Sequence, residues 1–193
     1  MSLSTVERAV LRELAGQVAE IAGLPVHGQK AELWRRLNDL ETVRPMVWIN
    51  EEPWHELNVD DELTPRCQDT WARNIEMDLR RTLYKWRHLR CDMIVSGFIS
   101  SPIVIRGAHF GIAEKSEILK TDAASGVVSR HFIPQLVEPE DVEKIQMPRL
   151  WLDEEATAVE FEKRSEIFSD ILPVKKVGMK HHWFTPWDNL IRF

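Results

Sequence analysis

Hydrophobic residues recur every three or four positions in several parts of the chain, which is the spacing of amphipathic helices. This pattern predicts helices over residues 4–21, 28–38, 65–89 and 153–168. Ser4 and Glu7 have the spacing of a capping box at the start of the first helix. Acidic residues at 138–141 suit the start of a short helix, and Asp153 suits the N-cap of the last long one.

Short apolar runs between these helices predict strands over residues 44–49, 92–95, 102–105, 110–113, 127–132 and 171–179. Strands that alternate with helices favour an α/β protein, and this order is that of the opening of a (β/α)8 TIM-type barrel. We therefore expect an N-terminal helical segment over residues 1–43 and the first part of a barrel over residues 44–193. A last helix begins at Thr185 and Pro186, and the chain ends about two turns later. We therefore expect the barrel to be incomplete.

The composition narrows the class of protein and its partners. The 193 residues carry 25 Lys and Arg against 31 Asp and Glu, and this formal charge of −6 argues against nucleic acid or an anionic membrane as the main partner. No apolar run approaches the roughly 20 residues that span a bilayer, and the N-terminus does not resemble a signal peptide. Cys67 and Cys91 lie at the two ends of the predicted helix 65–89, about 36 Å apart and too far for a disulfide. Two free thiols predict a cytoplasmic protein.

Two groups of side chains favour structural interpretations. The basic residues of 80–90 interleave with apolar ones at helical spacing, which is typical of a solvated helix face. Four of the eight tryptophans fall on apolar stripes and are expected in the core: Trp34, Trp71, Trp86 and Trp151.

Residues 50–57 carry the densest candidate chemistry, directly after the predicted strand 44–49. Adjacent residues of an extended chain point in opposite directions, so only one of Glu51 and Glu52 is expected to face a barrel mouth, while the other caps a helix or pairs with a lysine. With His55, these carboxylates form a candidate acid–base or metal site. A solvated acidic loop is the alternative. Asn50 and Trp54 are candidate substrate contacts.

A second candidate group follows the predicted strand 171–179. His181 and His182 occupy a strand end, where one histidine could face the site, and the sequence does not decide which. Trp183 and Trp187 are candidate walls of an apolar pocket, with core packing as the alternative. Asp188 is a candidate polar contact, although its place near a helix start also suits a structural charge.

Residues 33–38, 44–49, 92–95 and 102–105 together resemble the uroporphyrinogen decarboxylase superfamily, which includes the decarboxylase of haem synthesis and cobalamin-dependent methyltransferases. Residues 170–174 and 185–188 are similar to its divergent, decarboxylase-like members. The resemblance extends from about Leu33 to Phe193. It implies a (β/α)8 barrel with a site at the strand ends.

The departures from this family bear on the reaction. In the decarboxylase, the strand that corresponds to residues 46–49 leads into an arginine-rich loop that binds substrate carboxylates, whereas Glu51 and Glu52 stand there in this chain. Carboxylates repel a polycarboxylate porphyrinogen. The position of the family's catalytic aspartate, counted from Pro102, is Gly97. The methyltransferases hold zinc through one histidine and two cysteines, a spacing that this sequence lacks.

We therefore expect a divergent member that acts on a small molecule or transfers a methyl group, as a lyase or a methyltransferase. The resemblance requires no cofactor for a decarboxylase, and implies zinc and a corrinoid partner for a methyltransferase. The expected partner is a small-molecule substrate. The alternative is a non-catalytic, shortened domain that acts through a homodimer or a partner chain.

Overall fold

The computed structural model describes residues 3–89, 91–119 and 128–179, which form a mixed α/β protein with helices and a few short strands. The chain divides into two compact units. Unit 1 comprises residues 1–101 and 161–175, and unit 2 comprises residues 102–160 and 176–193. The expected helical segment 1–43 therefore lies in unit 1, together with the beginning of the segment expected as a barrel.

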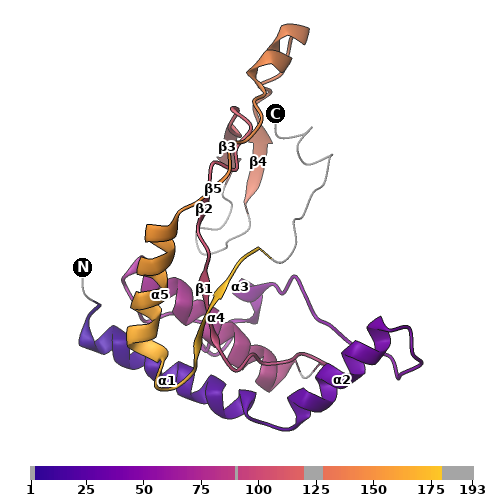
Figure 1. The fold of residues 1–193 in the computed structure, drawn as a ribbon, viewed down its shortest axis with the longest axis vertical. Coiled ribbons are helices and arrows are strands. Elements are labelled where there is room, and N and C mark those ends of the chain that lie inside the picture. The colour runs from indigo at the N-terminus through magenta and orange to yellow at the C-terminus, as the bar shows by residue number, and fades with distance from the viewer. Residues whose placement is uncertain (1–2, 90, 120–127, 180–193) are drawn as a thin grey trace. The chain divides into compact units, whose positions relative to one another are not determined.

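The helices of unit 1 begin where the sequence supplies caps. They are α1 (Thr5–Ala22), α2 (Val26–Asn38), α3 (Trp54–Leu57), α4 (Thr70–His88) and the C-terminal half of α5 (Glu154–Phe168) (Figure 1). The capping box of Ser4 and Glu7 is confirmed. Glu7 also accepts hydrogen bonds from the backbone N–H groups of Asp69 and Gln68, at 2.9 Å each, and so ties the start of α1 to the start of α4. These bonds and that of Ser4 lower the pKa of Glu7 to about 2.

Helix α4 starts at Thr70 and not at Pro65, as the pattern predicted, because Asp69 caps it and accepts from the Ala72 N–H. Residues 65–67 are held instead by Glu76, whose side chain is fully buried. The Glu76 carboxylate accepts from the N–H groups of Arg66 and Cys67 at 2.9 and 2.8 Å, and from Arg80 Nε at 2.8 Å. A buried carboxylate is tolerated only when its oxygens are bonded in this way.

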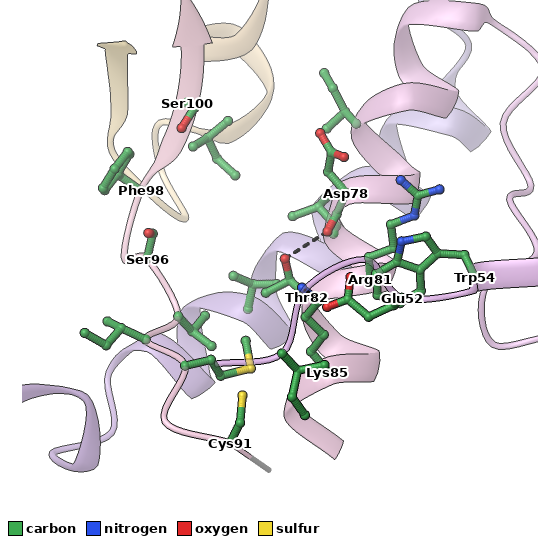
Figure 2. Close-up of a pocket in the computed structure, with 18 of the residues that line it drawn as sticks. Glu52, Trp54, Asp78, Arg81, Thr82, Lys85, Cys91, Ser96, Phe98 and Ser100 are labelled. Carbon is green, nitrogen blue, oxygen red and sulfur yellow. Dashed lines mark hydrogen bonds and ion pairs between the residues drawn. The ribbon is translucent and has the colours of Figure 1, made fainter. Parts of the chain in front are cut away.

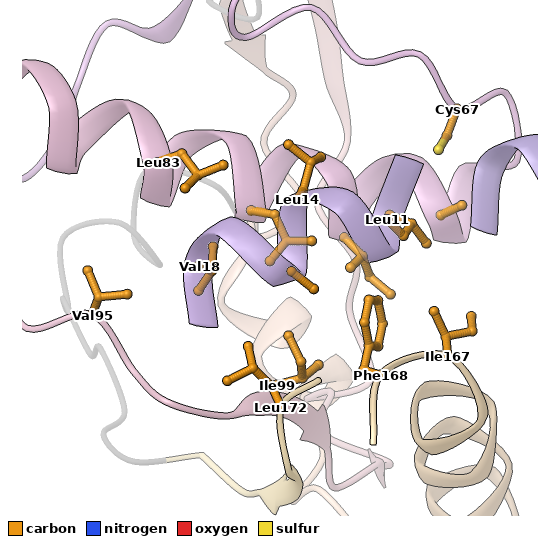
Figure 3. Packing of buried hydrophobic residues seen from close by; sticks show 14 of the residues in the cluster. Leu11, Leu14, Val18, Cys67, Leu83, Val95, Ile99, Ile167, Phe168 and Leu172 are labelled. Carbon is orange, nitrogen blue, oxygen red and sulfur yellow. The ribbon is translucent and has the colours of Figure 1, made fainter. Parts of the chain in front are cut away.

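The core of unit 1 lies between α1 and α4, which pack along one another (Figures 1 and 3). Both helices carry a stripe of buried apolar residues at steps of three and four, as the sequence pattern predicted. Phe168 of α5, fully buried, and Val95 and Ile99 of the chain after α4 complete the packing shown in Figure 3. Trp71 and Trp86 pack against this core, as expected.

The described strands form three separate two-stranded sheets, and no closed barrel is present among these residues. In one sheet, β1 (Ile99–Pro102) pairs with β6 (Val174–Val177). The antiparallel pairs are β2 (Ile105–Arg106) with β5 (Trp151–Leu152), and β3 (Ser116–Leu119) with β4 (Ser129–Phe132). The 3-10 helix over Pro139–Lys144 confirms the short helix predicted there.

The predicted strands 44–49 and 92–95 are wrong, as is the strand 110–113, because these residues have no strand ladder. The first two segments do lie side by side: the Asp92 N–H donates to the Val47 carbonyl at 2.9 Å. The return bond uses a side chain, since the Val47 N–H donates to the Asp92 carboxylate at 2.8 Å. Arg44 pairs with the same carboxylate.

In a sheet, a second strand would bond the backbone of residues 91–95. Here side chains of α2 make these bonds instead. Lys30 Nζ donates to the Cys91 carbonyl at 2.8 Å, and Trp34 Nε1 donates to the Asp92 carbonyl at 2.8 Å. The Val95 N–H donates to His27 Nδ1 at 3.3 Å. These bonds satisfy backbone groups that a sheet would otherwise bond.

Unit 2 has no apolar core among its described residues. Its one buried described side chain is Thr157, which accepts from the Val104 N–H at 2.9 Å. Trp151, expected in the core, is 57% exposed. It lies on a two-residue strand, too short to bury a large aromatic side chain.

His27 predicts how the stability of unit 1 depends on pH. It is 5% exposed, and Nε2 bonds to the Ile21 carbonyl while Nδ1 accepts from Val95, so the ring is neutral. Burial lowers the pKa of His27 below its ordinary 6.5. The unfolded chain therefore takes up this proton first as the pH falls, and stability present above pH 6.5 is lost below it.

Between about pH 7 and pH 5, the free energy of unfolding from urea titrations should fall less steeply in His27→Gln than in the wild type. Exposed His131→Gln is the control, and an unchanged slope in His27→Gln would contradict this assignment.

Candidate active site

A pocket of about 520 Å³ opens in unit 1, within the range of roughly 300–1,000 Å³ typical of small-molecule sites. One face of α4 forms one wall, and residues 91–100 form the other (Figure 2). Figure 2 shows Asp78, Thr82 and Lys85 on the helix side, opposite Ser96, Phe98 and Ser100. Residues 48–54 contribute a third segment, and Val18 of α1 and Arg164 of α5 complete the lining.

The structure brings two of the residues predicted from the sequence, Glu52 and Trp54, into this pocket. Asn50 and Glu51 are exposed, and His55 lies on the exposed face of α3 and does not line the pocket. Glu51 adopts a left-handed backbone, with φ of 60°. Only Glu52 turns inward, and the predicted division of roles between the two carboxylates is not seen. Glu52 both lines the pocket and pairs with Lys85, and Glu51 is not in the extended conformation that the prediction assumed. The remaining predicted site residues lie outside the described residues: His181, His182, Trp183, Trp187 and Asp188.

Glu52 pairs with Lys85 at the pocket wall, where their side chains are 6% and 22% exposed. An ion pair this far from bulk water is costly to desolvate, and removal of one partner leaves an uncompensated charge. The pair therefore fixes the loop 50–54 against α4. It also places a carboxylate and an ammonium group in the pocket lining.

Trp54 is held in place by α4. The guanidinium carbon of Arg81 lies 5.1 Å from the centre of the Trp54 ring and Lys85 Nζ lies 5.6 Å from it, distances at which cations attract aromatic faces. Tyr84 meets the same ring edge-on at 6.2 Å, and its hydroxyl donates to the Leu57 carbonyl at 3.1 Å. These contacts anchor the short α3, which is too short to be stable alone.

Asp78 and Arg164 give the pocket its perturbed electrostatics. Asp78 is an exposed residue of α4, yet partial desolvation by the surrounding protein raises its pKa, and the positive charges of Arg81 and Arg164 oppose the shift. Burial lowers the pKa of Arg164, and Asp78 opposes that shift. A carboxyl group with a raised pKa in a pocket is a candidate proton donor.

The sequence interpretation missed Asp78, Arg81, Lys85 and Arg164. The basic residues of 80–90 were assigned to a solvated face, yet Arg81 and Lys85 line the pocket, and the partly buried Arg80 pairs with Glu76. The spacing of Asp78, Thr82 and Lys85, at steps of four and three, was visible and places them on one helix face.

The described cysteines do not form a zinc site. Cys67 and Cys91 are both buried and free, and burial, together with Glu76, raises the pKa of Cys67 to about 12. Zinc binds the thiolate, so this environment opposes it. Among residues 3–89, 91–119 and 128–179, no three His, Cys, Asp or Glu side chains are arranged to hold a metal ion.

No protein-family model, curated protein or solved structure matches the chain. None of the helices in the described part of the chain combines the length and apolar character that a membrane crossing needs.

The ion pair of Glu52 and Lys85 predicts that substitutions of its two residues have non-additive effects on the free energy of unfolding. Lys85→Met should lower the free energy of unfolding by about 3 kcal/mol, because Glu52 loses its partner, whereas Glu52→Gln combined with Lys85→Met should recover most of this loss. Urea denaturation of the four members of the cycle measures the coupling. The exposed pair of Arg36 and Glu41 is the control, where Arg36→Met should cost less than about 1 kcal/mol. Equal effects at Lys85 and Arg36 would show that the pocket pair is not buried in solution.

Proposed function

We propose that this chain is a uroporphyrinogen decarboxylase-like protein that transforms a small organic molecule in the unit 1 pocket, as a lyase or a methyltransferase. The observation that carries the proposal is the pocket itself. Glu52, from the loop singled out in the sequence, pairs there with Lys85, and Asp78 and Arg164 line the same pocket. Apolar walls with a few convergent charged groups and a perturbed pKa are the usual composition of a catalytic pocket.

We propose the barrel fold together with this activity. Neighbouring strands at the opening of such a barrel would correspond to residues 44–49 and 92–95. These segments lie side by side through the bonds between Asp92 and Val47, although they form no ladder. The pocket is lined by Trp48 and Ile49 at the C-terminal end of the first segment, the end at which barrel enzymes place their sites, and by residues 91 and 93–96 along the second segment.

The pocket charges argue for a small substrate and against a porphyrinogen. Its lining carries Arg81, Lys85 and Arg164 against Glu52 and Asp78, so one positive charge is in excess. A polycarboxylate needs several cationic partners. Gly97, at the position matched to the family's catalytic aspartate, offers no carboxylate.

Asp78 is the proposed proton donor. A carboxyl group whose pKa is raised keeps its proton closer to neutral pH and can pass it to a carbon or oxygen that gains electrons. Lys85 and Arg164 would stabilise negative charge that develops nearby. In a decarboxylation, the bond to the carboxylate breaks, carbon dioxide leaves, and the proton from Asp78 replaces it on carbon.

Comparative metabolite profiling tests this function. The protein is incubated with a cell metabolite extract, which also supplies methyl donors and corrinoids, and the products are followed by mass spectrometry. We expect a small metabolite to lose carbon dioxide or to exchange a methyl group, and Asp78→Asn to slow this by about a hundredfold or more. Exposed Asp60→Asn should retain the wild-type rate. An unchanged extract, or a fully active Asp78→Asn variant, would contradict the proposal.

A second candidate, a non-catalytic domain that acts through self-association, is favoured by the surface of unit 2. Exposed hydrophobic side chains there include Ile118, Leu119, Leu150, Trp151 and Leu152, between 50% and 66% exposed. Each described sheet has only two strands, and exposed apolar strands are typical sites of pairing with a second chain.

Light scattering coupled to size exclusion tests this candidate. Self-association through unit 2 predicts a defined dimer that Leu119→Lys converts to a monomer, because a charge would enter the apolar contact. Val6→Lys, at a 74% exposed position of unit 1, should leave the dimer intact. A wild-type chain that elutes as a monomer at all concentrations rules this candidate out.

A further inference from the structure

We propose that the unit 1 pocket takes a small organic carboxylate with an apolar or aromatic body, the carboxylate lying at Arg81 and Arg164 and the body against Trp54 and Phe98. This inference rests on the proposed function, because it assigns a substrate class to the same pocket.

The charge of the pocket favours an anion. Glu52 and Lys85 neutralise one another, which leaves Asp78 opposite two guanidinium groups. Arg81 and Arg164 both line the cavity, and the positive charge of each acts on the Asp78 carboxylate. Guanidinium groups bind carboxylates and phosphates through paired hydrogen bonds, and the single positive charge in excess in the lining best matches a monoanionic carboxylate.

The rest of the lining favours an apolar body. Trp48, Trp54 and Phe98 lie around the cavity, and Met93, Val95 and Ile99 contribute its buried apolar residues. Trp48 is 60% exposed although it is the largest apolar side chain of its loop, and a bound ring would cover part of it. Trp54 is held by Arg81, Lys85 and Tyr84, so this aromatic surface is fixed before a ligand arrives. A preformed surface lowers the ordering cost of binding.

Substitution of Asp78 is expected to have opposite effects on ligand affinity and on reaction rate. When it is ionised, Asp78 competes with a ligand carboxylate for Arg81 and Arg164. Asp78→Asn removes this competition and retains the shape of the side chain. The variant should therefore bind a carboxylate more tightly than the wild type does, even though the proposed function predicts that it reacts more slowly.

The test compares phenylacetate with phenylacetamide, two ligands of nearly equal shape and different charge, by isothermal titration calorimetry on the full chain. We expect phenylacetate to bind about tenfold more tightly, because only the carboxylate forms charge-assisted bonds with the guanidinium groups. Arg81→Met and Arg164→Met should each abolish most of this preference, and Asp78→Asn should increase it. Arg73→Met, an exposed arginine elsewhere on α4, is the matched control and should bind as the wild type does.

Two outcomes overturn the inference: equal affinities for the two ligands, including no detectable binding of either, or a preference that survives in Arg81→Met as well as in Arg164→Met. Because Arg164 also lies 5.2 Å from the Trp71 ring, circular dichroism checks that its variant is folded, and Arg81→Met gives an independent result. A carboxylate preference without any turnover would leave this inference standing and reject the proposed function. Turnover of neutral metabolites with no carboxylate preference would do the reverse.

Discussion

Bonds from side chains to the backbone of residues 91–95 are the constraint on which the rest of unit 1 depends. Lys30 and Trp34 reach across from α2 to the carbonyls of Cys91 and Asp92, and His27 accepts from the Val95 N–H. The Asp92 carboxylate then bonds Val47 and so fixes the segment that leads to Glu52. Because residues 91–100 form a wall of the pocket, the same bonds that replace a strand ladder also position part of this wall.

A similar device operates at the other side of α4. Glu76 is fully buried, yet its carboxylate bonds the backbone of Arg66 and Cys67 and the side chain of Arg80. The helix is thereby fixed on one side by a structural carboxylate. On its pocket side it presents Asp78, Thr82 and Lys85. The helix thus carries a structural carboxylate on one side and, on the other, the pocket residue Asp78 beside Lys85, which Glu52 neutralises.

The sequence predicted what depends on local spacing. The capping box at Ser4 and the apolar stripes of α1 and α4 need only nearby residues, and their helices were predicted within a few positions. The predicted strands 44–49 and 92–95 failed because an apolar run looks the same whether its backbone bonds another strand or the side chains of Lys30 and Trp34. The sequence left open which of Glu51 and Glu52 turns inward, and the left-handed backbone of Glu51 breaks the alternation that the prediction assumed. The role of Asp78 could not be predicted from the sequence, because the opposite wall of its pocket is supplied by residues 91–100 and by Arg164, which are distant in the sequence.

The central claim is that unit 1 holds a preformed pocket that binds a small carboxylate between α4 and residues 91–100. A crystal structure of the protein soaked with bromophenylacetate tests this most directly, because the anomalous signal of bromine locates the ring independently of the fitted coordinates. We expect bromine in the pocket beside Trp54 and Phe98, with the ligand carboxylate within hydrogen-bond distance of Arg81 or Arg164. Bromine only at other sites, or a pocket filled by its own side chains, would contradict it.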